Sequence, residues 1–389
     1  MVVIINNRPD TVQGPLKTPF TEYFNVKHPI CLAGMNIGAG PKLGAAVIEA
    51  GGFACLGGNG YIKAPEYSTM SYAEFIEEFI SHQTPEKVRT QIHEMKSFLK
   101  NPLNVTFGID ILLPKVGGSA RRTNYDYTEG TAEKIIDVVI EEGGKMFISA
   151  LGVPEPHLVD RLHRGGVLVG GNIGHPRHVQ KVLDAGCDMI IAQGGEGGGH
   201  TGDVPSMLLL PMVLELCKGR VSKFTGRPII VLAAGGIYNS RGLAAALAMG
   251  ADGVWCGTRF VAATESGASD GHQKAVLETT VSGTARSTIY TGRPMRVQQN
   301  AYVAAWEKEP AKITALTQKG VVPINHDLDQ LAKSGKPVPA EMDHGMRPIL
   351  LGQAAGAITE ILPAKAIIDE MVYGTLALMK RCDDLRSKL

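Results

Sequence analysis

The sequence predicts a (β/α)₈ barrel, or TIM barrel, with a smaller α/β subdomain inserted after the eighth strand. Eight short apolar runs alternate with helical patterns over residues 28–260. The runs lack polar alternation, as expected for strands buried on both faces of a parallel sheet. No G-x-G-x-x-G motif follows the first run, so a doubly wound dinucleotide-binding sheet is the poorer interpretation.

The elements follow in a regular order. The expected strands lie, in chain order, within 28–35, 52–58, 104–114, 145–152, 167–174, 188–195, 228–236 and 253–260. Helical spacing appears between them, and several of these segments stop at a glycine, a common helix terminator. The clearest helices are expected within 41–51, 131–143, 175–186 and 240–250.

After residue 260 the pattern becomes irregular. We assign residues 1–260 and 345–389 to the barrel, and residues 261–344 to an inserted subdomain that covers the barrel mouth. The final stretch, 353–389, has helical spacing and is expected to close the barrel. Gln353 at its start either caps that helix or reaches the site, and a cap is the simpler interpretation.

Composition limits the kind of partner. The 389 residues are 44% hydrophobic and 20% charged, typical of a globular protein, and the 39 basic residues nearly balance the 38 acidic ones. No basic run suggests nucleic acid or an anionic membrane. The N-terminus is unlike a signal peptide, and no run of about 18 apolar residues could span a bilayer.

The cysteines and the last three residues indicate a compartment. Six cysteines occur without any C-x-x-C pair, so we expect buried thiols and no zinc site or other metal site, and no disulfide framework. The chain ends in Ser387-Lys388-Leu389, the tripeptide that peroxisomal import receptors read. We therefore predict a peroxisomal location and a eukaryotic source, or a cytoplasmic location if the tripeptide is not used.

Glycines gather where the expected strands end, which in this fold is the catalytic face. Tight turns alone explain any single one of them. After the last two strands, however, this fold commonly binds phosphate with loop amides. The N–H groups of Gly235, Gly236, Gly257 and Thr258, together with the Thr258 hydroxyl, are therefore candidates to bind the phosphate of a cofactor.

The sixth strand runs into "IIAQGGEGGGHTGD", residues 190–203. Its glycines would let the backbone pass close to a flat ligand. They also leave His200 without neighbours to bury it, so we expect the imidazole in a loop, exposed to the mouth and titrating near neutrality. A general base or a hydrogen bond to an anionic substrate would suit it.

Three polar side chains accompany His200. The amide of Gln193 is placed to contact the edge of a heteroaromatic ring. Glu196 is a second acid or base, although a carboxylate in a glycine loop equally suits capping of backbone amides. Asp203 has the character of a turn or cap residue.

Several separated motifs agree in order and spacing with one family. "PICLAGM", "AQGGEGGGHTG", "AAGGIYNSRGLAAALAMGADGVWCGTRF" and "TGRPMRV" resemble the nitronate monooxygenase family, formerly the 2-nitropropane dioxygenases. The resemblance extends from about residue 25 to residue 375. It implies an FMN-dependent TIM barrel.

The resemblance also assigns roles. It implies that His200 is catalytic, that the first-strand turn at Ala33, Gly34 and Met35 lies beside the flavin, and that the phosphate lies at the glycines and threonine named above. It further implies flavin contacts for the two positions Gln193 and Gly198. Relatives that reduce quinones with NADH carry a lysine where this chain has Asn172, but the "LLP" turn they share is present in "DILLPKVGG". NAD(P)H therefore stays open as an electron donor.

The stretch "KVGGSARRTNYDYTEG" is longer than a minimal turn. It is open whether this is a solvated loop or a lid whose cations Lys115, Arg121 and Arg122 attract an anionic or phosphate-bearing substrate such as an acyl-CoA.

Three functions follow from these patterns. The leading hypothesis is FMN-dependent oxidation of alkyl nitronates, such as propionate 3-nitronate, by O₂ to a carbonyl compound and nitrite. The alternative is an NAD(P)H-dependent flavin reductase of quinones or enoyl thioesters. The third is a non-catalytic FMN-binding protein in which His200 has no role.

Overall fold

A computed structural model describes residues 14–58, 83–103, 105–334 and 345–386. Its central feature is a closed barrel of eight parallel strands in the order β1-β2-β3-β4-β5-β6-β8-β9. The barrel closes where β1 pairs with β9, through Ile30 opposite Val254 and Leu32 opposite Cys256. The predicted TIM barrel is confirmed.

Each of the eight predicted strands is present. They are β1 (Ile30–Leu32), β2 (Phe53–Gly57), β3 (Phe107–Leu112), β4 (Met146–Ala150), β5 (Leu168–Ile173), β6 (Met189–Gln193), β8 (Ile230–Ala234) and β9 (Gly253–Cys256). Almost every residue of these strands is buried, because helices cover the outside and apolar side chains fill the inside.

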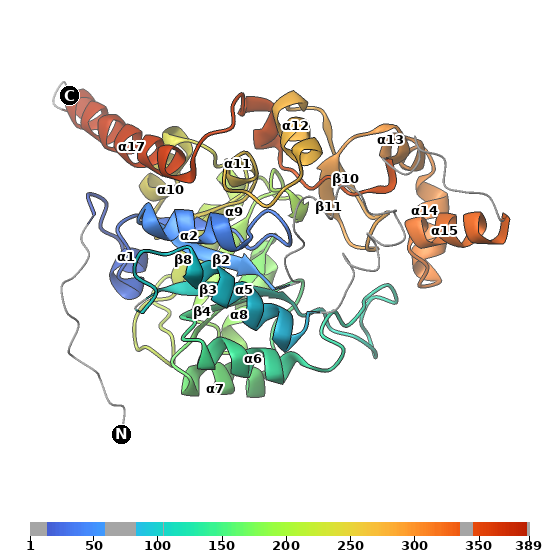
Figure 1. Cartoon of the computed structure of the whole chain (residues 1–389), viewed down its shortest axis with the longest axis horizontal. Coiled ribbons are helices and arrows are strands. Elements are labelled where there is room, and N and C mark those ends of the chain that lie inside the picture. Colours follow the sequence, from blue (N-terminus) through green and yellow to red (C-terminus); the bar gives the residue numbers. More distant parts are fainter. Residues whose placement is uncertain (1–13, 59–82, 104, 335–344, 387–389) are drawn as a thin grey trace.

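Helices follow the strands and pack around the barrel (Figure 1). Many begin with a proline in the first turn, where its missing N–H costs nothing, or with a capping side chain such as Asn239, which accepts the N–H of Gly242. The helices associated with the barrel are α2 (Pro41–Glu49), α5 (Pro85–Ser97), α6 (Ala132–Glu141), α7 (Pro156–Arg164), η1 (Pro176–His178), α8 (Val179–Asp184), α9 (Ser206–Cys217), α10 (Ser240–Met249) and α11 (Thr258–Val261).

Aromatic rings from α1 (Pro19–Phe24) close one end of the barrel. Phe20 and Phe24 belong to the same hydrophobic cluster as the inward-facing strand residues, and their ring centroids lie 5.7 and 4.7 Å from that of Phe53. Because this end is filled, a ligand can enter only at the opposite end, where the strands have their carboxyl termini.

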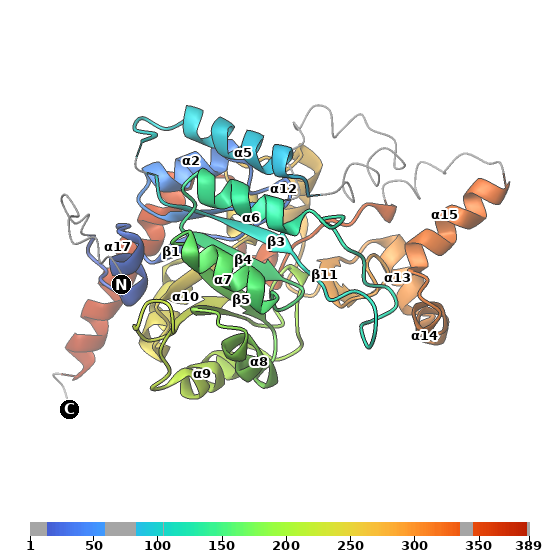
Figure 2. The same ribbon diagram turned by 90° about the horizontal axis from the view of Figure 1, so that it is seen from below.

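A second, antiparallel sheet lies beyond the barrel, in the order β10 (Thr284–Ser287), β11 (Met295–Gln298), β7 (Gly199–His200). Its own hydrophobic cluster runs from Ile289 to Met346. The helices of this region are α12 (Asp270–Glu278), α13 (Ala301–Glu307), α14 (Pro310–Gln318) and α15 (Pro323–Ser334), and Figures 1 and 2 both show α13–α15 projecting to one side of the barrel. The predicted boundary of the subdomain, residues 261–344, partly falls outside the described residues.

One predicted helix is wrong in part. The stretch 353–389 is not a single helix: it contains η2 (Gln353–Ala357), an extended connection, and α17 (Ala364–Arg386). Leu362 in the connection bridges to Ala263 as an isolated strand pair. Pro363 explains the break, because a residue before proline is pushed away from helical geometry while proline itself suits a helix start.

The cysteines and the end of the chain were also the subject of sequence predictions. Five cysteines are buried and Cys382 is exposed, and none of the six forms a disulfide. The tripeptide Ser387-Lys388-Leu389 lies outside the described residues, so peroxisomal import stays a prediction. Among the helices of the described ranges, none combines the length and apolarity needed to cross a membrane.

Phe20→Ala tests the aromatic closure of the barrel. Phe20 has no exposed surface, so its truncation should lower the free energy of unfolding by about 3–5 kcal/mol. Denaturant unfolding of both variants measures this, with Phe98→Ala as the control because Phe98 is 51% exposed. Equal losses in the two variants would show that α1 does not stabilise the barrel.

Candidate functional site

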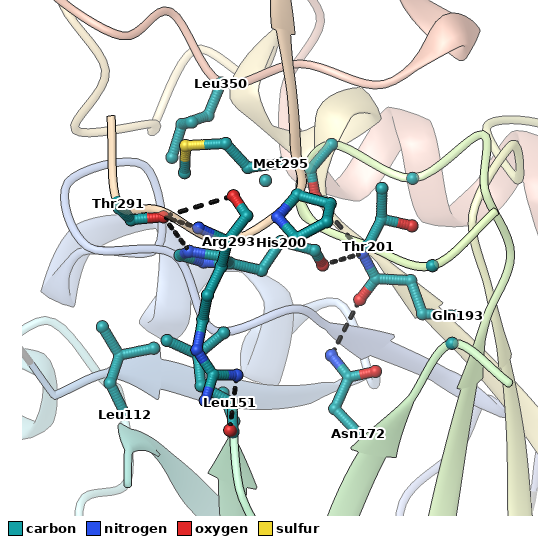
Figure 3. Close-up of a pocket in the computed structure, with 18 of the residues that line it drawn as sticks. Leu112, Leu151, Asn172, Gln193, His200, Thr201, Thr291, Arg293, Met295 and Leu350 are labelled. Atoms are coloured by element: carbon teal, nitrogen blue, oxygen red, sulfur yellow. Dashed lines mark hydrogen bonds between the residues drawn. The ribbon is translucent and has the colours of Figure 1, made fainter. Parts of the chain in front are cut away.

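A cavity of about 1060 Å³ opens at the carboxyl ends of the strands. It is bounded by the barrel, by the β3–α6 loop and by the second sheet (Figure 3). The structure brings the predicted catalytic and cofactor-binding residues to this cavity. The ten that line it are Ala33, Gly34, Met35, Gln193, Gly198, His200, Gly235, Gly236, Gly257 and Thr258.

The glycines after β6 are needed because other chain segments touch their backbone. A Cβ on Gly198 would lie 2.7 Å from the Gly352 nitrogen, and one on Gly197 would lie 2.7 Å from Nε2 of Gln193. Both distances are too short for any side chain. The segment can therefore cross the cavity only as bare backbone.

Gln193 holds this segment in place. Its side-chain NH₂ donates to the carbonyl oxygens of Gly198 (3.3 Å) and His200 (3.0 Å), and its Oε1 accepts from Nδ2 of Asn172 at 2.7 Å (Figure 3). Both ends of the amide are thus engaged by the protein. The flavin contact expected of Gln193 stays a prediction, and the geometry gives this residue a positioning role besides.

His200 differs from the sequence expectation in two ways. It lies in β7 rather than in a loop, opposite Met295 of β11. Burial, and then the nearby charge of Arg293, lower the pKa of His200 to about 3, so the expected titration near neutrality is wrong. The imidazole is neutral at physiological pH.

Thr291 orients the His200 ring. Its Oγ1 lies 2.9 Å from Nε2 of His200 and also donates to the carbonyl oxygen of Arg293 at 3.4 Å. With the hydroxyl proton directed to that carbonyl, Oγ1 accepts a hydrogen bond from Nε2–H of His200. Nδ1, which has no hydrogen-bond partner in the described ranges, then carries the lone pair that can accept a proton or hydrogen bond.

Arg293 is a site residue that sequence reasoning missed. Its guanidinium donates to the Leu151 carbonyl (2.8 Å) and to Oδ1 of Asn124 (2.9 Å), and it forms no ion pair with any carboxylate of the described chain. Burial, and then Arg121, lower its pKa from the ordinary value. A half-buried cation with neutral partners leaves a positive field in the cavity that suits an anion.

The Arg293 contact also fixes strained backbone. Leu151, whose carbonyl it binds, has φ of 65°, in the left-handed region that non-glycine residues seldom adopt. The "TGRPMRV" motif was the available signal for Arg293 and Thr291, but it does not indicate that they would meet a histidine some 90 positions earlier in the chain.

Asp110 is a second missed residue. It faces the barrel interior at the end of β3, and its Cβ would lie 2.3 Å from a Cβ on Gly34. Burial raises its pKa to about 8, and within the described residues its Oδ1 has no hydrogen-bond partner. The close approach explains the glycine in the first-strand turn, and the carboxyl is largely protonated at neutral pH.

The other polar candidates are structural. Glu196 accepts the N–H and hydroxyl of Ser206 at the start of α9, the capping alternative given above. Asp203 is exposed and lies 3.7 Å from Arg286. Gln353 begins η2, donates its N–H to the Glu196 carbonyl and does not line the cavity.

The loops that follow β8 and β9 contain backbone N–H groups without an acceptor in the described chain. Gly235 and Gly236 have φ of 92° and 74°, and in the described chain their amides, like that of Thr258, donate to no acceptor. The Thr258 hydroxyl accepts from the Gly352 N–H at 2.9 Å and keeps its own proton. These residues fit a bound phosphate, because unsatisfied donors beside a cavity favour an anion.

Part of the long loop after β3 lines the cavity. Arg121, Arg122 and Tyr127 line it, whereas Lys115 does not. Arg122 donates to the Gln318 carbonyl in α14, which ties the loop to the second sheet region. Between the two alternatives for this loop, the geometry favours a covering segment.

Comparison with known proteins agrees with this geometry. The profile of the nitronate monooxygenase family matches residues 17–374. A Mycobacterium tuberculosis protein named (3aS,4S,5R,7aS)-5-hydroxy-7a-methyl-1-oxo-octahydro-1H-indene-4-carboxyl-CoA dehydrogenase is 34% identical over 75% of this chain and 69% of its own. A probable nitronate monooxygenase of Staphylococcus saprophyticus is 32% identical over 74% of this chain and 80% of its own length. Among solved structures, FabK from Thermotoga maritima has a TM-score of 0.69 at 25% identity, covering 96% of this chain and 100% of its own.

The fold and these relatives together define an oxidoreductase built on a TIM barrel. The match over residues 17–374 makes the assignment more specific: the chain belongs to the nitronate monooxygenase family.

The pKa of His200 predicts how stability depends on pH. Between its ordinary value of 6.5 and about 3, the unfolded chain binds a proton on His200 that the folded chain does not, so stability falls as pH falls through this window. His200→Asn removes that contribution. Denaturant midpoints measured from pH 7 to pH 5 should therefore fall less steeply for His200→Asn than for wild type.

His157→Asn is the control, since His157 is 55% exposed. Parallel profiles for wild type and His200→Asn would contradict the low pKa.

Proposed function

We propose that the protein binds FMN across the mouth of the barrel and uses it to oxidise an anionic substrate. The free N–H groups of Gly235, Gly236 and Thr258 support a phosphate there, and family membership supports a flavin. Ala33, Gly34 and Met35 would lie beside the ring, with Gly198 and Gln193 of the glycine segment. When bound, the flavin supplies the electron acceptor.

The leading substrate class is the alkyl nitronates, which O₂ oxidises to a carbonyl compound and nitrite. The observation that carries this is the juxtaposition of Arg293 and His200: a fixed cation without a carboxylate partner beside a neutral imidazole. Arg293 would attract the nitronate oxygens. An anion held there also raises the pKa of His200, so that the imidazole accepts a hydrogen bond or proton only when the substrate is bound.

A second candidate keeps the barrel and the flavin: NAD(P)H-dependent reduction, or reversible dehydrogenation, of a thioester. One observation favours it: the 34% identical relative is named a carboxyl-CoA dehydrogenase. Quinones are the remaining substrate class of this alternative.

A peroxisomal location is also kept as a proposal. It rests on the terminal tripeptide Ser387-Lys388-Leu389 alone. The relatives named above are bacterial and do not bear on it.

Gly236→Asp tests the phosphate site. Aspartate tolerates the left-handed backbone of Gly236 and would place a like charge beside the phosphate. FMN affinity, measured by flavin fluorescence titration of the apoprotein, should fall at least tenfold, equal to roughly 1.4 kcal/mol. Gly219→Asp is the matched control, because Gly219 has nearly the same φ of 71° and open space around it. Unchanged FMN binding in Gly236→Asp would place the phosphate elsewhere.

His200→Asn tests the reaction. Aerobic nitrite release from propionate 3-nitronate should fall about 100-fold or more, the usual size of an acid–base contribution, while the flavin stays bound. His157→Asn should retain full turnover. Robust nitrite release by His200→Asn would remove the imidazole from the mechanism, and rapid anaerobic bleaching of the flavin by NADPH, without nitronate turnover, would select the second candidate.

A further inference from the structure

A group of basic side chains lines the outer part of the cavity. Arg177 and His178 belong to η1, which directly follows β5, and Lys181 lies one turn later in α8. All three line the cavity. Nε of Arg177 lies 3.3 Å from Nε2 of His178, whose ring centroid is 6.0 Å from that of His175. We call Arg177, His178 and Lys181 the rim cluster.

The cavity carries an excess of positive charge although the chain as a whole is nearly neutral. In the described chain six arginines and lysines line it, against the three carboxyl groups of Asp110, Glu196 and Asp203. Asp110 is largely protonated because burial raises its pKa to about 8. Glu196 caps α9, and Asp203 faces Arg286. The cations of the rim cluster are therefore not neutralised from within the cavity.

The rim cluster has no carboxylate partner in the described chain. Within the described ranges, neither Arg177 nor Lys181 forms an ion pair, and both side chains are exposed. Burial lowers the pKa of His178, and Arg177, His175 and Lys181 lower it further. His178 is therefore the neutral acceptor of the hydrogen bond from Nε of Arg177, and the cations of Arg177 and Lys181 stay available to a polyanion.

The two cationic regions lie in one cavity but serve different parts of a ligand. Arg293 and His200 face the reacting end. The side chains of Arg177 and Lys181 are exposed, whereas His200 and Arg293 are partly buried, so the rim cluster forms the outer of the two regions. A ligand that used both regions would place its reactive group at the inner one and its negative charges at the outer one.

We propose that Arg177, His178 and Lys181 bind the phosphates of an adenosine diphosphate tail that bears an additional ribose phosphate. CoA thioesters carry this chemistry with a 3′-phosphate, and NADPH carries it with a 2′-phosphate. Lysine and arginine side chains bind phosphate through charge-assisted hydrogen bonds, and several together match a group of phosphates. The proposal rests on the second candidate function, since nitronate oxidation by O₂ requires no nucleotide.

Isothermal titration of the FMN-loaded full chain tests this with 3′,5′-ADP and 2′,5′-ADP as probes. We expect wild type to bind at least one probe, more weakly at 200 mM than at 50 mM salt, and Arg177→Gln/Lys181→Gln to bind it at least tenfold more weakly. Lys380→Gln/Arg381→Gln on α17 is the matched control, because it removes the same two charge types from exposed positions outside the cavity. The control should bind like wild type.

The outcomes separate the two sources of the tail. Preference for 3′,5′-ADP supports a CoA thioester, preference for 2′,5′-ADP supports NADPH, and equal binding supports recognition through the adenosine 5′-phosphate that the two probes share. No binding of either probe, or wild-type binding by Arg177→Gln/Lys181→Gln, overturns the proposal. Because binding is measured without turnover, a binding protein that neither reduces thioesters nor oxidises NADPH would sink the second candidate function and leave the rim site standing.

Discussion

The site depends on the passage of one backbone segment through a space that admits no side chains. After β6 the chain crosses between the Gln193 amide and the Gly352 backbone, then pairs with β11 through His200 and Met295. Glycine is the residue that can make this crossing, because each of these neighbours lies within 3 Å of where a Cβ would be. The crossing brings His200 from the barrel to Thr291 and Arg293 of the second sheet region.

Much of this arrangement could be predicted from the sequence, because its determinants are local. Unbroken apolar runs identify strands buried on both faces, and parallel strands bring their carboxyl ends to one rim, so residues from Ala33 to Thr258 could be assigned to one cavity before the fold was known. The break before α17 could also have been predicted, since Pro363 marks it in the sequence.

The remaining features depend on contacts between distant segments. Thr291 and Arg293 meet His200 only because β7 pairs with β11, and no periodicity in either segment encodes that pairing. The low pKa of His200 follows from the same contact, which buries the ring beside a cation. The role of Asp110 could not be predicted for another reason: the position of a carboxyl group within an apolar run does not indicate whether it faces the helices or the barrel interior.

The shared sheet has a mechanical consequence. His200, Thr291, Arg293 and Met295 are joined by strand pairing and hydrogen bonds, whereas the glycines proposed to hold the phosphate directly follow the barrel strands β8 and β9. Gln193 of β6 also binds the His200 carbonyl, and the Leu151 carbonyl directly after β4 accepts from Arg293. The imidazole and the guanidinium are therefore held at a fixed height above the barrel as well as at a fixed distance from each other, so a substitution in the glycine tether would disturb both at once.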